Sequence, residues 1–160
     1  MTQAETLLAL ARSAKASIAT AESCTGGMIG AAITDVAGSS DIFDRGFITY
    51  SNAAKRDLLG VRPATLLRHG AVSEEVAREM AEGALSRSAA TMSIAVTGIA
   101  GPGGSDHKPE GRVCFGLARK GHLPLVETVE FGPIGRAKVR QATVDHALAM
   151  MIRALGNDQA

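Results

Sequence analysis

Helix-like and strand-like segments alternate along the first two thirds of this 160-residue chain. The helix-like segments carry apolar residues three or four positions apart, and the strand-like segments are short runs of apolar and β-branched residues. This alternation predicts helices at residues 4–14, 27–37, 53–60 and 73–89, a further helical turn from Pro63, and strands at 17–23, 43–51 and 91–98.

The last third of the chain follows a different order. Segments 112–121 and 123–132 predict a hairpin around Lys120 and Gly121, and residues 135–155 predict a long helix. Alternating helices and strands favour a parallel sheet that is covered on both faces, whereas a hairpin adds antiparallel strands. We therefore predict a single α/β domain over residues 1–160, with three α/β/α layers and a mixed sheet.

Composition argues against several classes of function. The net charge is +1 and aromatic residues make up 3% of the chain, so neither an electrostatic footprint for nucleic acid nor a base-stacking surface is indicated. No apolar run approaches the ~18 residues that a membrane span needs. Cys24 and Cys114 do not form a disulfide framework. We expect a cytoplasmic protein without nucleic-acid or membrane partners.

Two glycine-containing turns follow predicted strands, at residues 23–27 and 98–104. In open α/β sheets, ligands bind beyond the carboxyl ends of the strands, and glycine lets backbone N–H groups approach an anion. These turns are candidate binding sites, although a tight turn that requires glycine for its backbone conformation is an equally good interpretation.

Nucleophilic and metal chemistry leave few candidates. Cys24 follows a strand and precedes a helix, where a thiol can ionise, but none of the four histidines stands in a pairing motif that would supply a base. A packed, unreactive Cys24 is the favoured interpretation. The chain lacks H-x-x-x-H, D-x-D and close Cys/His spacings, so we expect no metal and no cofactor.

Lys55 occupies an unusual place for a solubilising lysine. With Asn52 as the helix N-cap, Lys55 is the third helical residue, at the positive end of the helix dipole. Desolvation in a cleft would lower its pKa further, and a neutral lysine can deprotonate a serine hydroxyl. The alternative is a surface lysine on a short helix.

Four segments together resemble the CinA C-terminal domain family, whose characterised enzymes are nicotinamide-nucleotide amidohydrolases. The segments are TAESCTGG, DVAGSSDIFDRGFITYSNAAKRDLLGV, HGAVSEEVAREMAEGAL and TGIAGPGG, and the resemblance runs from about Glu5 to Leu155. It implies hydrolysis of the carboxamide of nicotinamide mononucleotide to nicotinate mononucleotide and ammonia, without a metal ion.

The resemblance also implies roles for individual residues. Ser40 would be the nucleophile, Lys55 the base and Tyr50 its neighbour, and we expect the single strand between Ser40 and Lys55 to return the chain to the same edge of the sheet.

Thr97 and Gly98 would contact the substrate, and Arg136 would bind the phosphate, with Arg140 as an alternative. Substrate or oxyanion contacts are further expected from Ser23, Thr25, Gly26 and Gly27, and Ser23 is an alternative nucleophile.

Two functions remain open at this point. The first is the amidohydrolase, and the second is a non-catalytic nucleotide- or partner-binding domain linked to competence or damage responses. A serine, tyrosine and lysine that are all present favour the enzyme, since a binding domain would not require them. We also expect a homo-oligomer, either a dimer or a larger assembly.

Overall fold

A computed structural model describes residues 1–105 and 107–157. Its centre is a five-stranded sheet with the strand order β2-β1-β3-β4-β5. Strands β1, β2 and β3 are parallel to one another, and β4 and β5 form the predicted antiparallel hairpin. The mixed sheet is therefore confirmed. The strand bounds are β1 Ile18–Glu22, β2 Phe43–Ile48, β3 Met92–Gly98, β4 Arg112–Arg119 and β5 Leu125–Glu130.

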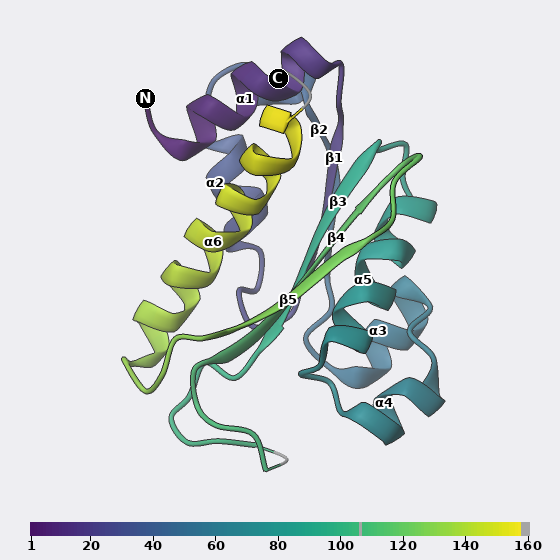
Figure 1. Ribbon diagram of the computed structural model, residues 1–160, viewed down its shortest axis with the longest axis vertical. Coiled ribbons are helices and arrows are strands. Elements are labelled where there is room, and N and C mark those ends of the chain that lie inside the picture. Colours follow the sequence, from purple (N-terminus) through teal and green to yellow (C-terminus); the bar gives the residue numbers. More distant parts are fainter. Residues whose placement is uncertain (106, 158–160) are drawn as a thin grey trace.

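Helices cover both faces of this sheet, which confirms the predicted α/β architecture (Figure 1). One face carries α1 Gln3–Ala14, α2 Met28–Thr34 and α6 Arg136–Gly156, and the other carries α3 Asn52–Leu59, α4 Pro63–His69 and α5 Glu74–Ser86. The central strands β1 and β3 are buried almost throughout, whereas the edge strands β2 and β5 are largely exposed. Burial between two helical layers explains the apolar run in β3.

The two faces of the sheet differ in side-chain size. Strand residues facing α1, α2 and α6 are large, such as Ile94 and Phe115, whereas those facing α5 are small, such as Ala21 and Ala95. Small residues let α5 lie close to the sheet: a Cβ added at Gly116 would come within 2.4 Å of the Ala77 carbonyl oxygen. The short helices α3 and α4 pack against α5 in the same layer.

Several predicted boundaries need correction. Helix α2 ends at Thr34 rather than at residue 37, and a 3-10 turn, Ser39–Asp41, follows it. Ser51, not Asn52, caps α3, because the Ser51 side chain accepts a hydrogen bond from the Ala54 N–H. Asn52 is therefore the first helical residue, and Lys55 is the fourth rather than the third.

Three parallel strands end at the same edge of the sheet, which is the lower edge in Figure 1. Four segments gather there: the turn at residues 23–27, the start of α3, the described parts of the loop between β3 and β4 (99–105 and 107–111), and the start of α6. None of the helices in the described part of the chain is long and apolar enough to cross a bilayer.

Gly83 lies where α5 contacts the end of α3, and its substitution tests how closely the two helices pack. A Cβ at this position would come within 2.0 Å of the Leu59 carbonyl oxygen, at the end of the helix that carries Lys55. Gly83→Ala should therefore lower the free energy of unfolding in urea by roughly 1–3 kcal/mol. Gly156→Ala is the control, because nothing lies within 4 Å of an added Cβ there. Stabilisation by Gly83→Ala, which helix propensity alone favours by about 1 kcal/mol, would show that the approach is not tight.

Candidate active site

Lys55 is the most unusual buried residue of the structure. Its side chain is among the largest of those that are fully buried, with 1% relative exposure. Lys55 and Leu59 lie one turn apart on α3 and are the two buried residues of this helix. The short helix therefore directs an ammonium group into the protein at the place where an apolar side chain would normally stand.

Among the residues that the structure describes, the Lys55 amine has only uncharged hydrogen-bond partners. Its Nζ lies 3.0 Å from Ser23 Oγ, 3.2 Å from the Thr49 carbonyl oxygen and 3.2 Å from the Tyr50 carbonyl oxygen. Buried lysines are normally paired with a carboxylate, which would stabilise the charged form. Here desolvation lowers the pKa of Lys55 from 10.5 to about 8.

The three contacts of Lys55 Nζ match the two N–H groups and the lone pair of a neutral amine. The carbonyl oxygens of Thr49 and Tyr50 can only accept hydrogen bonds, so they take the two N–H groups. The third partner, the Ser23 hydroxyl, can donate. In the neutral state the lone pair on Nζ therefore faces the Ser23 proton, which is the arrangement that general-base catalysis requires.

Burial of this amine also makes the stability of the fold depend on pH. The folded protein releases the Lys55 proton near pH 8 and the unfolded chain near pH 10.5, so the unfolded state binds more protons between these values. Burial of the charged Lys55 amine lowers the free energy of unfolding by about 3 kcal/mol below pH 8. This loss decreases between pH 8 and 10.5 and is absent above that window.

Glu22 fixes the turn that presents Ser23. Its buried carboxylate accepts four hydrogen bonds, one from the Thr25 hydroxyl at 2.5 Å and three from N–H groups at the start of α2. The three N–H donors are Gly27 at 3.2 Å, Ile29 at 2.9 Å and Gly30 at 3.0 Å. The Thr25 hydroxyl and the Gly27 N–H, which were expected to hold substrate, are therefore engaged inside the protein.

Cys24 is packed rather than activated. Its side chain is buried, and burial raises the pKa of the thiol to about 11, so the group stays protonated at neutral pH. Because the thiolate is the nucleophilic form, this environment favours the unreactive interpretation of Cys24.

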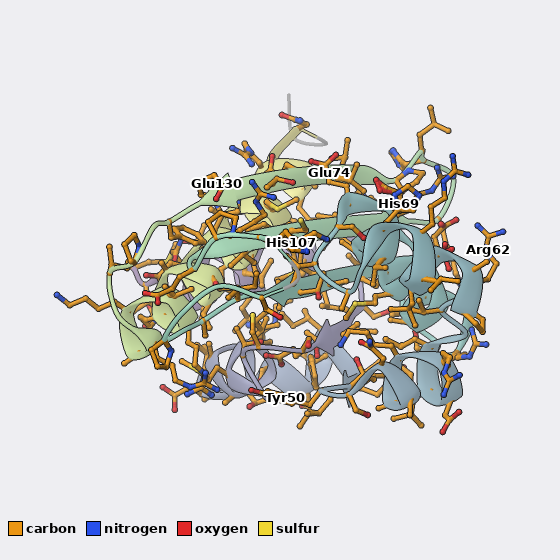
Figure 2. The ribbon with its side chains drawn as sticks, turned by 90° about the horizontal axis from the view of Figure 1, so that it is seen from below. Tyr50, Arg62, His69, Glu74, His107 and Glu130 are labelled. Carbon is orange, nitrogen blue, oxygen red and sulfur yellow. The ribbon has the colours of Figure 1, made fainter. Side chains whose placement is uncertain are left out.

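A cleft of about 300 Å³ lies at the same edge of the sheet, and it is linked to Lys55 through Tyr50, which lines the cleft and whose carbonyl oxygen contacts the Lys55 amine. Residues lining it include Tyr50, Gly98, Lys108 and Arg136. The Tyr50 hydroxyl accepts a hydrogen bond from Arg136 Nη2 at 3.0 Å, and Arg136 Nη1 donates to the Gly101 carbonyl at 2.6 Å. Figure 2 looks onto this edge and shows Tyr50 near its outer margin, where 61% of the residue is exposed.

Thr97 and Arg140, two other candidate site residues, make internal contacts. The Thr97 hydroxyl donates to the Ala71 carbonyl at 2.8 Å. The Arg140 guanidinium donates to the Cys24 carbonyl at 3.1 Å and to the Thr25 carbonyl at 3.2 Å. Of the two arginines proposed for phosphate, Arg136 lines the cleft and Arg140 holds the turn.

The structure does not bring Ser40 to Lys55. Ser40 lies in the exposed 3-10 turn before β2, and Lys55 follows β2. A six-residue strand spans roughly 20 Å. The expectation that one strand returns the chain to the same edge is therefore corrected, since a single strand carries the chain to the opposite edge. Ser23, the alternative nucleophile, lies at the end of β1 and reaches Lys55.

Sequence reasoning missed Glu22 and Lys108. An acidic residue that ends a buried strand just before a glycine-rich helix start is a signal for Glu22, because such a carboxylate can accept the orphan N–H groups of the helix. Lys108 donates to the carbonyls of His69 and Val72 and so joins the 98–111 loop to the α4–α5 connection. Nothing in the local sequence indicates that contact.

Comparison with known proteins places the chain among CinA-related sequences. A relative from Enterobacter agglomerans, named nicotinamide-nucleotide amidohydrolase PncC, is 55% identical over 125 residues, which are 78% of this chain and 76% of that protein. A CinA-like protein of Chlorobaculum tepidum is 55% identical over 121 residues, which are 75% of this chain and 29% of that protein. The chain spans about a third of the length of several curated relatives that it matches.

Comparison of the fold with solved structures also finds CinA-related proteins. The crystal structure of the competence/damage inducible protein CihA from Agrobacterium tumefaciens superposes with a TM-score of 0.92 at 48% identity, over 96% of this chain and 93% of that one. The family model for the CinA C-terminal domain matches residues 1–155. The chain belongs to the CinA C-terminal domain family.

Proposed function

We propose that this protein hydrolyses the carboxamide of nicotinamide mononucleotide, with Ser23 as nucleophile and Lys55 as general base. The observation that carries the proposal is the 3.0 Å contact between Lys55 Nζ and Ser23 Oγ. The amine is buried, and its hydrogen-bond partners in residues 1–105 and 107–157 are all uncharged. Proximity and a lowered pKa are the two properties that activate a serine by a lysine.

The reaction divides into two acyl-transfer steps. Ser23 Oγ bonds to the carboxamide carbon while its proton moves to Lys55 Nζ. The C–N bond then breaks, and Lys55 gives that proton to the leaving nitrogen, which departs as ammonia. Water next attacks the resulting ester, and Lys55 accepts a water proton. When the ester bond to Oγ breaks, the proton passes to Ser23, so both residues return to their starting states.

The choice of substrate rests on the relative named nicotinamide-nucleotide amidohydrolase and on the cleft. A volume of about 300 Å³ is at the small end of ligand sites and suits one mononucleotide. Arg136 stands at the cleft with a guanidinium that can form a bidentate contact to phosphate. Tyr50, which contacts Arg136 through its hydroxyl and Lys55 through its carbonyl, would orient both ends of the substrate.

Replacement of the two proposed reacting groups tests this assignment. Ser23→Ala and Lys55→Ala should each lower kcat by at least about 10³-fold, because both belong to one catalytic unit, and the double variant should be little worse. Ser40→Ala is the matched control and should keep kcat within about twofold. Ammonia release from nicotinamide mononucleotide measures all four proteins.

A reversed result would restore Ser40 as the nucleophile: loss of activity in Ser40→Ala together with near-normal activity in Ser23→Ala. If the unaltered protein binds the mononucleotide in calorimetry but releases no ammonia at high concentration, the chain acts instead as a nucleotide-binding domain.

The pH dependence of turnover gives the pKa of the general base. In the free enzyme the base is active when Lys55 is neutral, so kcat/KM should rise about tenfold per pH unit below pH 8 and level off above it. The second ionisation of a phosphate falls near pH 6, well separated from this limb. A profile that is flat between pH 7 and 9 would exclude Lys55 as the group whose deprotonation limits the reaction.

Arg136→Ala tests recognition of the phosphate. Loss of a charge-assisted contact should raise KM for the mononucleotide by roughly 10–100-fold while kcat changes little. Lys138→Ala removes an exposed cation from the same turn of α6 and should leave KM unchanged. Nicotinamide riboside lacks the phosphate, so its hydrolysis should be equally fast with either variant. Equal losses on both substrates would show that Arg136 does not contact phosphate.

A further inference from the structure

The proposed reaction places negative charge on the carboxamide oxygen, and hydrolases of this kind stabilise that charge with preorganised N–H donors. Candidates are the backbone N–H groups that follow Ser23, since they lie nearest to a group attached to its Oγ. An N–H that already donates a hydrogen bond inside the protein is not available to the oxyanion. The acceptor of each N–H therefore shows which of them could be an oxyanion donor.

Nearly every N–H from residue 23 to residue 30 is already engaged. Glu22 takes those of Gly27, Ile29 and Gly30, which include the N-terminal groups of α2. The Ser23 N–H donates to Val96, that of Gly26 to the Ser23 carbonyl, and that of Met28 to the Thr25 carbonyl. The start of α2 is therefore closed to an anion, and the Gly26 and Gly27 donors expected from the sequence are not free.

Two N–H groups of residues 23–30, those of Cys24 and Thr25, are not accounted for by these hydrogen bonds. The Cys24 N–H faces its own sulfur atom, which is a weak acceptor. The Thr25 N–H has no acceptor within the part of the chain that the structure describes. Thr25 lies two residues after Ser23, the spacing at which a serine Oγ reaches a backbone N–H in a turn. Within the described residues, the Thr25 N–H is thus the backbone donor of this segment that has no acceptor.

Arg140 sets the direction of this donor. Its Nε donates to the Cys24 carbonyl and its Nη2 to the Thr25 carbonyl. In a trans peptide the C=O and N–H lie in one plane and point in opposite directions, so an arginine that holds the Cys24 carbonyl leaves the Thr25 N–H pointing away from the guanidinium. The Thr25 hydroxyl, bound to Glu22, fixes the same residue from another direction.

We propose that the Thr25 N–H is an oxyanion donor and that Arg140 is the positioning residue that aims it at the carboxamide oxygen; this inference rests on the proposed amidohydrolase function. Arg140 and Arg136 lie one turn apart on α6 but act differently. Arg136 reaches the cleft, whereas Nε and Nη2 of Arg140 donate to backbone carbonyls of the Ser23 turn.

Replacement of one backbone atom tests the donor directly. Substituting the α-hydroxy acid analogue of threonine at position 25 keeps the side chain and exchanges the N–H for an ester oxygen. We expect kcat to fall by roughly 10²-fold or more and KM to change by less than about threefold. The same exchange at Ala64, an exposed residue in the first turn of α4, is the control. A kcat within threefold of normal for the Thr25 ester would overturn the proposal.

Arg140→Ala tests the positioning role through the split between kcat and KM. It should lower kcat by roughly 10²-fold with little change in KM, and guanidinium ion at tens of millimolar should restore at least part of the lost kcat by replacing the missing group. Arg153→Ala on the same helix should lose nothing and gain nothing from guanidinium. A raised KM with normal kcat would assign Arg140 to phosphate binding and overturn the proposal.

A second measurement separates this inference from the proposed function and from failure to fold. Thermal unfolding establishes that each variant is folded, and Arg140→Lys replaces Arg140→Ala if the latter is not. The rate at which a fluorophosphonate labels Ser23 is then measured without any nucleotide. Labelling of the unaltered protein without ammonia release would reject the substrate but not the donor, which the Thr25 ester should still slow. Equal labelling of unaltered and ester proteins would overturn the donor assignment.

Discussion

The burial of the Lys55 amine against a serine hydroxyl and two carbonyls is the interaction on which the site depends. Solvation or a carboxylate partner would hold this group charged, and it could not then accept a proton at neutral pH. The protein instead retains a penalty of about 3 kcal/mol in the folded state. Active sites commonly retain such destabilising arrangements, because the reactive state of the group depends on them.

The fold supplies this environment through the layout of its sheet. Strands β1 and β2 run parallel, so Ser23 at the end of β1 and the backbone just beyond β2 meet at one edge. The backbone there provides both carbonyls that hold Lys55, and the Thr49 N–H is tied to the Glu22 carbonyl at 2.8 Å. Glu22 binds N–H groups of the Ser23 turn and Arg140 binds its carbonyls. Opposite charges on the two sides of one turn thus fix the nucleophile and, in our proposal, the oxyanion donor.

Much of this architecture could be predicted from local patterns. Apolar periodicity predicted the hairpin and the long helix, and the position of Lys55 in a short helix predicted a lowered pKa. The expectation that Ser40 lies near Lys55 overlooked the topology: the single strand between the two residues, β2, carries the chain from one edge of the sheet to the other. Arg140 was misjudged for a related reason: a side chain that satisfies backbone groups 116 residues away leaves no local signature. Glu22, whose partners all lie within eight residues, does have a local signal, but that signal was missed.

Direct titration of Lys55 tests the central claim. The protein, labelled with 13C at the lysine ε position, is followed by NMR from pH 6 to pH 11, and the Lys55 resonance is assigned by its absence from a Lys55→Arg variant. The account predicts one lysine that titrates near pH 8, well below the ordinary value of 10.5. A Lys55 resonance that titrates above pH 10 would mean that the amine is charged throughout the physiological range, and Lys55 could not then serve as the base for Ser23.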